Sequence, residues 1–214
     1  MNWLTHPYRS FGKRLLDLTV SLPLLAAVAP LFAVIAAAVK LTSRGPVFFV
    51  QERLGRGGRT FRTLKFRTMT DHDRTSHQEI IGKTDEVTSV GFWLRRFKLD
   101  ELPQLWNIVN GDMSLVGPRP ALPAQLAEYT SLAKCRLLVR PGLTGLAQVH
   151  GNIHLSWPER WVYDAEYVSR ISFALDVWIV ARTVAVILLG EERFLRQPTQ
   201  ADGVVPTSQT QLFG

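Results

Sequence analysis

No charged residue interrupts the segment Leu18-Thr-Val-Ser-Leu-Pro-Leu-Leu-Ala-Ala-Val-Ala-Pro-Leu-Phe-Ala-Val-Ile-Ala-Ala-Ala-Val39. At about 1.5 Å of helical rise per residue, its 22 residues are long enough to cross the ~30 Å hydrocarbon core of a bilayer. Lys40 and Arg44 follow the segment, where a secretory signal peptide would have small residues and a cleavage site. We therefore expect the segment to stay in the protein and to enter lipid.

Two prolines inside the segment bear on how it enters the membrane. Pro23 and Pro30 each remove a backbone donor and can kink a helix, and Pro30 lies near the centre. Basic residues flank both ends, and positive charges tend to stay on the cytoplasmic side. These features favour a re-entrant helix-break-helix that turns at Pro30. A straight span is the alternative, because proline also occurs in spanning helices, and a buried core helix is the least favoured interpretation.

The charge distribution points to an anionic partner. The chain has 214 residues and a formal net charge of +7. Residues 1–70 contain 11 Lys or Arg and 2 Asp or Glu, whereas residues 71–214 contain 14 and 16. Such a basic first third suits contact with phospholipid, a phosphorylated substrate or nucleic acid. The hydrophobic content of 46% excludes a disordered chain, and the single cysteine, Cys135, excludes a disulfide framework.

A second apolar stretch, residues 171–189, contains Asp176 and Arg182. Each charge would cost several kcal/mol in the middle of a membrane, which argues against a second span. Aromatic residues with polar tips, which prefer membrane surfaces, gather before and within the stretch. They are Trp157, Trp161, Tyr163, Tyr167 and Trp178. An amphipathic helix on the membrane surface and an ordinary core helix are equally open interpretations.

A β-hairpin and a polar loop are predicted after the first apolar segment. Residues 46–50 and 60–68 have the pattern of short strands around the turn Gly55-Arg-Gly-Gly58. Residues 70–89 are polar and are predicted to be a loop. The loop contains two histidines near two aspartates, but their spacing matches no standard set of metal ligands. We interpret them as loop residues: His72 and His77.

Two adjacent carboxylates, Asp100 and Glu101, precede a predicted helix. Pro103 suits the first turn of this helix, which is expected to run to Asn110 and to stop at Gly111. Neighbouring side chains within a helix diverge by about 100°, but at its irregular start they can converge on one ligand. From the spacing alone, N-capping by Asp100, worth ~1 kcal/mol, is the preferred interpretation.

Two segments rich in glycine and proline follow, residues 111–120 and 139–148. They lack the periodicity of strands or helices and are predicted to be rigid loops. Each carries an arginine next to proline, Arg119 and Arg140. A guanidinium on such a stiff backbone suits bidentate binding of phosphate oxygens. A tight turn with a solvated arginine is the alternative for either loop taken singly.

Together and in this order, the segments resemble the bacterial sugar transferases, monotopic phosphoglycosyl transferases that begin glycan assembly on polyprenyl phosphate. The resemblance runs from Lys13 to about Leu189, and the length matches the minimal form of the family. Each motif is weak alone, whereas the ordered set is specific. The motifs are Lys13-Arg-Leu-Leu-Asp17, Gly45-Pro-Val-Phe-Phe49, Gln51-Glu-Arg53, Lys65-Phe-Arg-Thr-Met69, Leu99-Asp-Glu-Leu-Pro-Gln-Leu-Trp-Asn107, Gly111-Asp-Met-Ser-Leu-Val-Gly-Pro-Arg-Pro120 and Arg140-Pro-Gly-Leu-Thr-Gly145.

The resemblance implies an α+β, mainly helical fold. A re-entrant membrane helix-break-helix, a small β-hairpin and amphipathic interfacial helices would surround a compact catalytic domain. We expect residues 1–44 to form the membrane hairpin, residues 45–190 the catalytic domain and residues 191–214 a polar tail. The expected location is the bacterial inner membrane, with the catalytic domain on the cytoplasmic face. Ala29 departs from the family pattern, because serine usually precedes the proline at Pro30.

The resemblance also implies transfer of a sugar 1-phosphate from a UDP-sugar to polyprenyl (undecaprenyl) phosphate with release of UMP. Asp100 would be the nucleophile that forms a covalent phosphosugar intermediate, and Glu101, together with Asp100, would bind Mg²⁺. Asn152, close to His150, stands where the family pattern often has arginine. The family correspondence implies that three basic residues contact the substrate phosphates, namely Lys65, Arg95 and Arg119. Arg140, on its proline-flanked loop, is the fourth predicted phosphate contact.

Two alternative functions stay open. One is the same transfer by a direct mechanism in which Asp100 acts only as a base. The other is a non-enzymatic basic protein that binds lipid or nucleic acid, with an affinity that falls steeply with salt and does not depend on Asp100. The resemblance favours a UDP-sugar, polyprenyl phosphate and membrane phospholipid as partners, downstream glycosyltransferases as further partners, and no nucleic acid.

Overall fold

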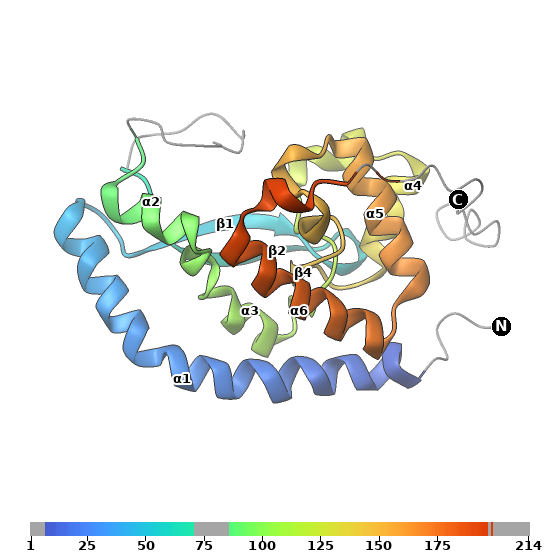
Figure 1. Ribbon diagram of the computed structural model, residues 1–214, viewed down its shortest axis with the longest axis horizontal. Coiled ribbons are helices and arrows are strands. Elements are labelled where there is room, and N and C mark those ends of the chain that lie inside the picture. The colour runs from blue at the N-terminus through green and yellow to red at the C-terminus, as the bar shows by residue number, and fades with distance from the viewer. Residues whose placement is uncertain (1–6, 71–85, 197, 199–214) are drawn as a thin grey trace.

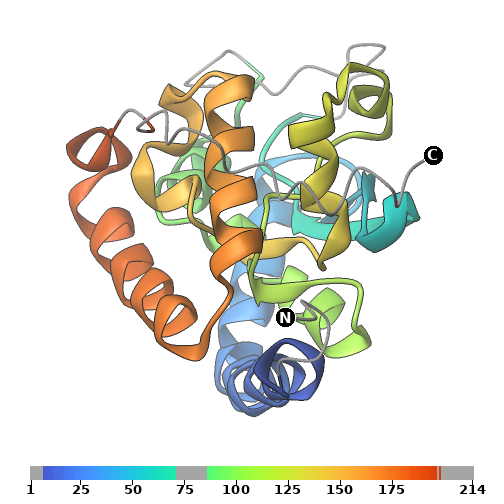
Figure 2. The ribbon, with the colours of Figure 1, turned by 90° about the vertical axis from the view of Figure 1, so that its right-hand side faces the viewer.

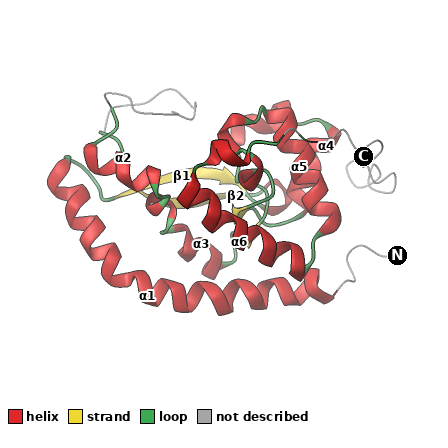
Figure 3. Cartoon of the chain, viewed as in Figure 1, coloured by secondary structure: helices red, strands yellow, loops and turns green. Residues whose placement is uncertain are grey.

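The structure, a computed structural model, describes residues 7–70, 86–196 and 198. One long helix, α1 (Lys13–Thr42), runs along the edge of the molecule, and the other helices and two small sheets pack to one side of it (Figures 1 and 3). This arrangement confirms a mainly helical fold with a long apolar N-terminal helix and small sheets.

Helix α1 contains the whole apolar segment and continues through Pro23 and Pro30. A break at Pro30 is therefore not confirmed, although Figure 1 shows that the helix changes direction along its length. Among the described residues, α1 is the one helix long and apolar enough to cross a membrane, and only 11% of its apolar stretch is buried. This exposure does not fit the core helix of a soluble protein.

The predicted β-hairpin is confirmed. Strands β1 (Phe48–Leu54) and β2 (Thr60–Phe66) pair in antiparallel fashion around a short turn. The predicted loop 70–89 falls largely outside the described residues, and so do His72 and His77.

The next part of the chain holds two short helices, α2 (Ser89–Arg96) and α3 (Gln104–Asn110). A single 3-10 turn, Leu99–Glu101, lies between them. Helix α3 begins after Pro103 and ends at Gly111, whose φ of 90° is a conformation that glycine adopts readily at a helix end. Both ends of α3 agree with the sequence prediction.

A second sheet joins the two segments rich in glycine and proline. Strands β3 (Ser114–Val116) and β4 (Gly142–Thr144) pair in parallel, so the prediction that both segments are loops without strands was wrong in part. Three residues are too few to show a period of two. Gly117 and Gly142 approach so closely that a Cβ on Gly142 would overlap the Gly117 backbone nitrogen.

Helix α4 (Ser131–Lys134) lies between β3 and β4 in the chain, and α5 (Trp157–Arg170) and α6 (Phe173–Leu189) follow β4. Tyr163 and Tyr167 on α5 are buried in the main core. One face of α6 is buried against the domain through Asp176, Ile179 and Val186, whereas its outer face is apolar and exposed. Figure 2 shows α1 nearly end-on, with α6 beside it on the outside of the molecule. The large exposed residues of α6 are Phe173, Val177, Trp178, Val180, Val184, Leu188 and Leu189.

The chain continues past α6 into a 3-10 turn, Glu191–Phe194. Beyond this turn, the Arg196 backbone N–H donates to the His150 carbonyl at 3.0 Å, and the Tyr163 hydroxyl donates to the Arg196 carbonyl at 2.9 Å. The first residues of the predicted tail thus pack onto the domain, whereas residues 199–214 lie outside the described part.

A buried ionic cluster attaches α1 to α6. Asp176, which is fully buried, accepts hydrogen bonds from Lys13 Nζ at 2.7 Å and from the Tyr8 hydroxyl at 2.5 Å. The Tyr167 hydroxyl donates to its second oxygen at 2.8 Å. A charge removed from water is tolerated when it is paired and hydrogen-bonded in this way. Asp176 is thus a satisfied core residue on a helix whose outer face is apolar.

Arg14 connects α1 to the C-terminal end of α3. Its guanidinium donates to the carbonyls of Ile108 and Val109 at 2.5 and 2.7 Å. These belong to the last carbonyls of the helix, which have no partner within it. Asp17, one turn further along α1, accepts from the Leu115 backbone N–H at 2.9 Å. The first turns of the apolar helix therefore fix the positions of the C-terminal end of α3 and of β3.

Candidate active site

Asp100 and Glu101 lie in the 3-10 turn before α3, and each is 8% exposed. Lys98, which precedes this turn, has a left-handed backbone with φ 56°. The N-cap position of α3 is occupied by Pro103, and no side chain caps the helix there. N-capping of α3 by Asp100, which the spacing alone favoured, is therefore wrong, because Asp100 lies in the 3-10 turn and Pro103 takes the N-cap position.

Asn107 places α3 against the hairpin. Its Nδ2 donates to the Arg62 carbonyl at 2.8 Å, and its Oδ1 accepts from the Leu64 backbone N–H at 3.1 Å. The side chain thus replaces a neighbouring strand at the edge of β2. As a result, Lys65 on β2 faces the turn that holds the carboxylates.

Glu101 is paired with two cations. Lys65 Nζ lies 2.8 Å and Arg119 Nη2 lies 2.9 Å from Glu101 Oε1. Burial alone would raise the pKa of the Glu101 carboxyl, but Arg119 and Lys65 outweigh this effect and hold the pKa well below its usual value. Glu101 is thus ionised at neutral pH and holds both cations at the turn. Both cations, Lys65 and Arg119, also line a small pocket. Its other lining residues are Arg53, Thr63, Gln104 and Pro120.

Asp100 has a different environment from its neighbour. Its Oδ1 is buried and has no hydrogen-bond partner. Burial raises the pKa of Asp100 from 3.8 to about 6, and the charge of Glu101 adds to the rise. A carboxylate that is ionised at neutral pH, yet unpaired and desolvated, is suited to act as a nucleophile. Three cations partly oppose the rise, namely Lys65, Lys98 and Arg95.

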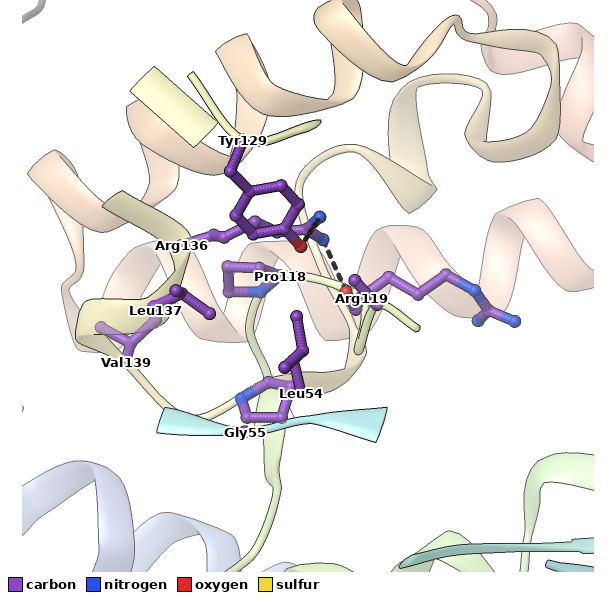
Figure 4. Close-up of a pocket in the computed structure, with 10 residues that line it drawn as sticks. Leu54, Gly55, Pro118, Arg119, Tyr129, Arg136, Leu137 and Val139 are labelled. Atoms are coloured by element: carbon purple, nitrogen blue, oxygen red, sulfur yellow. Dashed lines mark hydrogen bonds between the residues drawn. The ribbon is translucent and has the colours of Figure 1, made fainter. Parts of the chain in front are cut away.

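Arg119 is supported from behind by Arg136. The Arg136 guanidinium donates to the Arg119 carbonyl at 2.6 Å and to the Tyr129 hydroxyl at 2.9 Å, and lies 3.2 Å from the Asp164 carboxylate. Figure 4 shows the hydrogen bonds of Arg136 to Arg119 and Tyr129 in a small pocket, from which the Arg119 side chain points away. The backbone of Arg119 is therefore held while its guanidinium is directed toward Glu101.

The remaining predicted phosphate contacts differ in position. Arg95 Nε donates to the Thr68 hydroxyl at 2.9 Å, and its charge acts on Asp100. Arg140 Nε donates instead to the carbonyl of Gly111 at 2.8 Å, which is at the far end of α3. The structure thus brings three of the four predicted basic residues to the carboxylates and does not bring Arg140 there.

Sequence reasoning missed two residues at this site, Lys98 and Glu191. Lys98 precedes the motif around Asp100, and its Nζ lies 2.7 Å from Glu191 Oε1. The residue type gave no signal, because a left-handed turn is expected at glycine or asparagine rather than at lysine. Glu191 was assigned to the polar tail, where no partner could be foreseen.

The two carboxylates are compatible with a magnesium ion. No group of three or more His, Cys, Asp or Glu side chains occurs among the described residues. Magnesium does not need such a group, because it keeps several waters and is bound by one or two carboxylates together with substrate phosphates. The unpartnered Oδ1 of Asp100 is an oxygen of the required kind.

Comparison with known proteins agrees with the motifs. The model of the bacterial sugar transferase family matches residues 8–190. The chain is 42% identical over 179 residues to the uncharacterized sugar transferase EpsL of Bacillus subtilis, which covers 84% of this chain and 88% of that protein. It is 37% identical over 199 residues to the exopolysaccharide production protein ExoY of Sinorhizobium fredii, covering 86% and 88%.

A further relative has a longer chain. A UDP-glucose:undecaprenyl-phosphate glucose-1-phosphate transferase of Xanthomonas campestris pv. campestris is 41% identical over 196 residues, which are 86% of this chain and 40% of that protein. The family match extends over α1, the hairpin, the carboxylate turn and all of α6. The protein therefore belongs to the bacterial sugar transferase family.

Proposed function

We propose that this protein transfers a sugar 1-phosphate from a UDP-sugar to polyprenyl phosphate and releases UMP, as the first membrane step of surface glycan assembly. Relatives named as glucose-1-phosphate and N-acetylgalactosamine phosphotransferases acting on undecaprenyl phosphate support this reaction. The observation that carries the proposal is the contrast between two adjacent carboxylates. Glu101 is paired with two cations, whereas Asp100 is buried and has an unpartnered oxygen.

The proposed reaction has two steps, both at the phosphorus that bears the sugar. First, an oxygen of Asp100 attacks this phosphorus, and the bond to the bridging oxygen breaks, so that UMP leaves with the electron pair. The phosphosugar is then held on Asp100 as an acyl phosphate. Second, an oxygen of polyprenyl phosphate attacks the same phosphorus and restores the carboxylate. Because the pKa of Asp100 is about 6, no base is needed to ionise it at neutral pH.

Cations are required because both substrates are anionic. Lys65 and Arg119, which Glu101 holds in place, and the nearby Arg95 would pair with phosphate oxygens as charge moves onto them. Glu101 is thus proposed to position the cations before the donor binds.

A magnesium ion bound by Asp100, Glu101 and the substrate phosphates would add charge neutralisation at the same phosphorus. Glu101, whose low pKa keeps it ionised, is the more constant ligand of the two. Replacing it, as in Glu101→Gln, should weaken the dependence of activity on Mg²⁺. If Glu101→Gln has the rate of the wild type and the same dependence on Mg²⁺, then Glu101 is not a magnesium ligand.

We further propose that residues 1–44 form a re-entrant membrane helix and that residues 45–190 form a domain on the cytoplasmic face of the inner membrane. The change of direction in α1 and the basic residues at both its ends support this arrangement. Exposed aromatic side chains on and just after α2 and along α6 suit the membrane surface. Those at α2 are Phe92, Trp93 and Phe97.

Released UMP provides the test. The purified chain in lipid nanodiscs receives polyprenyl phosphate and a panel of UDP-sugars, and UMP is measured. Asp100→Asn should abolish release. Asp112→Asn makes the same chemical change at a partly exposed carboxylate beyond α3 and should leave activity near that of the wild type. If the wild type releases no UMP from any UDP-sugar, the proposed function is wrong.

Intact-mass spectrometry distinguishes the covalent route from the direct one. With donor but without lipid, the wild type should gain the mass of a phosphosugar, and Asp100→Asn should not. Turnover without this adduct would favour direct transfer. A basic scaffold instead predicts lipid binding that falls steeply with salt and is equal in Asp100→Asn and the wild type.

A further inference from the structure

Two residues other than glycine have a left-handed backbone in the part of the chain that the structure describes, Lys98 with φ 56° and Asn152 with φ 46°. Both side chains reach one carboxylate. Lys98 Nζ lies 2.7 Å from Glu191 Oε1, and Asn152 Nδ2 donates to the same oxygen at 3.0 Å. Lysine is uncommon in this conformation, and backbone strain of this kind concentrates at functional sites. Three distant segments thus meet at Glu191.

This cluster of Lys98, Asn152 and Glu191 borders the carboxylate pair. The Lys98 carbonyl accepts from the Glu101 backbone N–H at 3.2 Å, and the Lys98 ammonium is among the charges that act on Asp100. A hydrogen bond also joins the end of α2 to α6. Figure 1 accordingly shows the C-terminal end of α6 beside the segment that connects α2 to α3. The cluster is therefore next to the proposed reaction centre.

The cluster differs chemically from the cations at Glu101. Lys65 and Arg119 suit phosphate oxygens, whereas the Glu191 carboxylate would repel a diphosphate and accept hydrogen bonds from neutral groups. Oε1 of Glu191 already accepts from two donors, but Oε2 is buried and has no hydrogen-bond partner. Buried polar atoms in folded proteins are nearly always paired. A neutral ligand with hydrogen-bond donors fits this oxygen.

We propose that Lys98, Asn152 and Glu191 form the subsite that receives the sugar ring of the donor and selects among sugars. The inference rests on the proposed function, in which Asp100 attacks the phosphorus bonded to the sugar, so that the ring must lie close to that side chain. A sugar ring is neutral and rich in hydroxyl groups, which match the acceptor on Glu191 and the donors beside it. Sites that hydrogen-bond a substrate hydroxyl discriminate strongly against analogues that do not present it.

The test compares two cluster variants, Glu191→Gln and Asn152→Gly, with the control Glu192→Gln. Glycine accepts the left-handed backbone at position 152, so Asn152→Gly removes the amide without adding strain. Glu192 is the exposed neighbour of Glu191 and provides a matched charge change. For each protein in nanodiscs, kcat/KM for UMP release is measured with UDP-glucose, UDP-galactose and their N-acetylated amino counterparts.

We expect the preference for the best donor over the next to fall about tenfold or more in both cluster variants and to stay unchanged in Glu192→Gln. Inhibition by UMP, which carries no sugar, should be equal in all proteins. An equal loss of kcat/KM for every donor, or weaker inhibition by UMP in the cluster variants, would overturn the inference.

Calorimetric binding of the same UDP-sugars makes the test independent of turnover. Suppose that the wild type binds the donors selectively, that both cluster variants lose the selectivity, and that no protein releases UMP. The proposed function would then fail while the sugar subsite would be supported. Binding that is equally selective in all proteins would refute the subsite, whatever the outcome for UMP release.

Discussion

Neutralising Asp100 should make the protein more stable while it removes activity. The side chain is 8% exposed, its Oδ1 has no hydrogen-bond partner, and burial raises its pKa from 3.8 to about 6. A rise of roughly two pKa units corresponds to ~3 kcal/mol between the two protonation states. The folded protein therefore carries a cost of this order when Asp100 is ionised, and Asp100→Asn, which is nearly isosteric and neutral, removes it.

The pH dependence of this gain has a defined sign. Because the pKa is higher in the folded state than in the unfolded state, folding favours the protonated form of Asp100. The cost is absent below about pH 4, where both states are protonated, grows between about pH 4 and pH 6, and is complete above that range. At about 2–4 °C per kcal/mol for a chain of this size, Asp100→Asn should raise the Tm by several degrees above pH 6.

Thermal unfolding of the wild type, Asp100→Asn and Asp112→Asn over a range of pH measures this effect. Asp112 is only partly buried, so its replacement should change stability by no more than about 0.5 kcal/mol. A Tm for Asp100→Asn that is equal to or below that of the wild type at every pH would refute the idea that the fold holds Asp100 ionised against burial.

Three further outcomes are expected. As Asp100 becomes protonated, kcat/KM for the donor should fall about tenfold per pH unit below about pH 6, and a flat pH profile of UMP release would contradict this. Lys13→Met leaves Asp176 buried without its cation and should lower the free energy of unfolding by about 3–5 kcal/mol in a denaturant titration; a change below 1 kcal/mol, roughly, would show that the two tyrosines suffice. Gly142→Ala places a methyl group against the Gly117 backbone and should destabilise by about 1–3 kcal/mol, whereas an unchanged Tm would mean that β3 and β4 can separate.

The sequence predicted those elements whose ends are determined by the backbone preferences of a few neighbouring residues. Helix α3 begins after Pro103 and ends at Gly111, and the hairpin forms around its glycine-rich turn, because backbone geometry at these residues leaves few alternatives. Strands β3 and β4 could not be foreseen in this way. Each is three residues long, and the pairing partner lies in a different segment of the chain.

The candidate site likewise depends partly on local sequence and partly on tertiary packing. The spacing around Asp100 favoured an N-cap, and only the resemblance to a family pointed to a nucleophile. The environment that distinguishes Asp100 from Glu101 is built by residues remote in sequence, such as Lys65 and Arg119, which only tertiary packing brings to the turn. Arg140 shares the proline-flanked pattern of Arg119, but packing directs it to the opposite end of α3.

The two hydrogen bonds from Arg14 to the end of α3 connect this short helix rigidly to α1. Helix α3 has seven residues, about 10 Å in length, and is too short to bend appreciably. Helices in lipid tilt when the bilayer becomes thinner or thicker. A tilt of α1 would be transmitted through Arg14 and this stiff connector to Asp100, the proposed nucleophile. In the proposed membrane arrangement, we therefore expect the rate of UMP release to change with the acyl-chain length of the host bilayer.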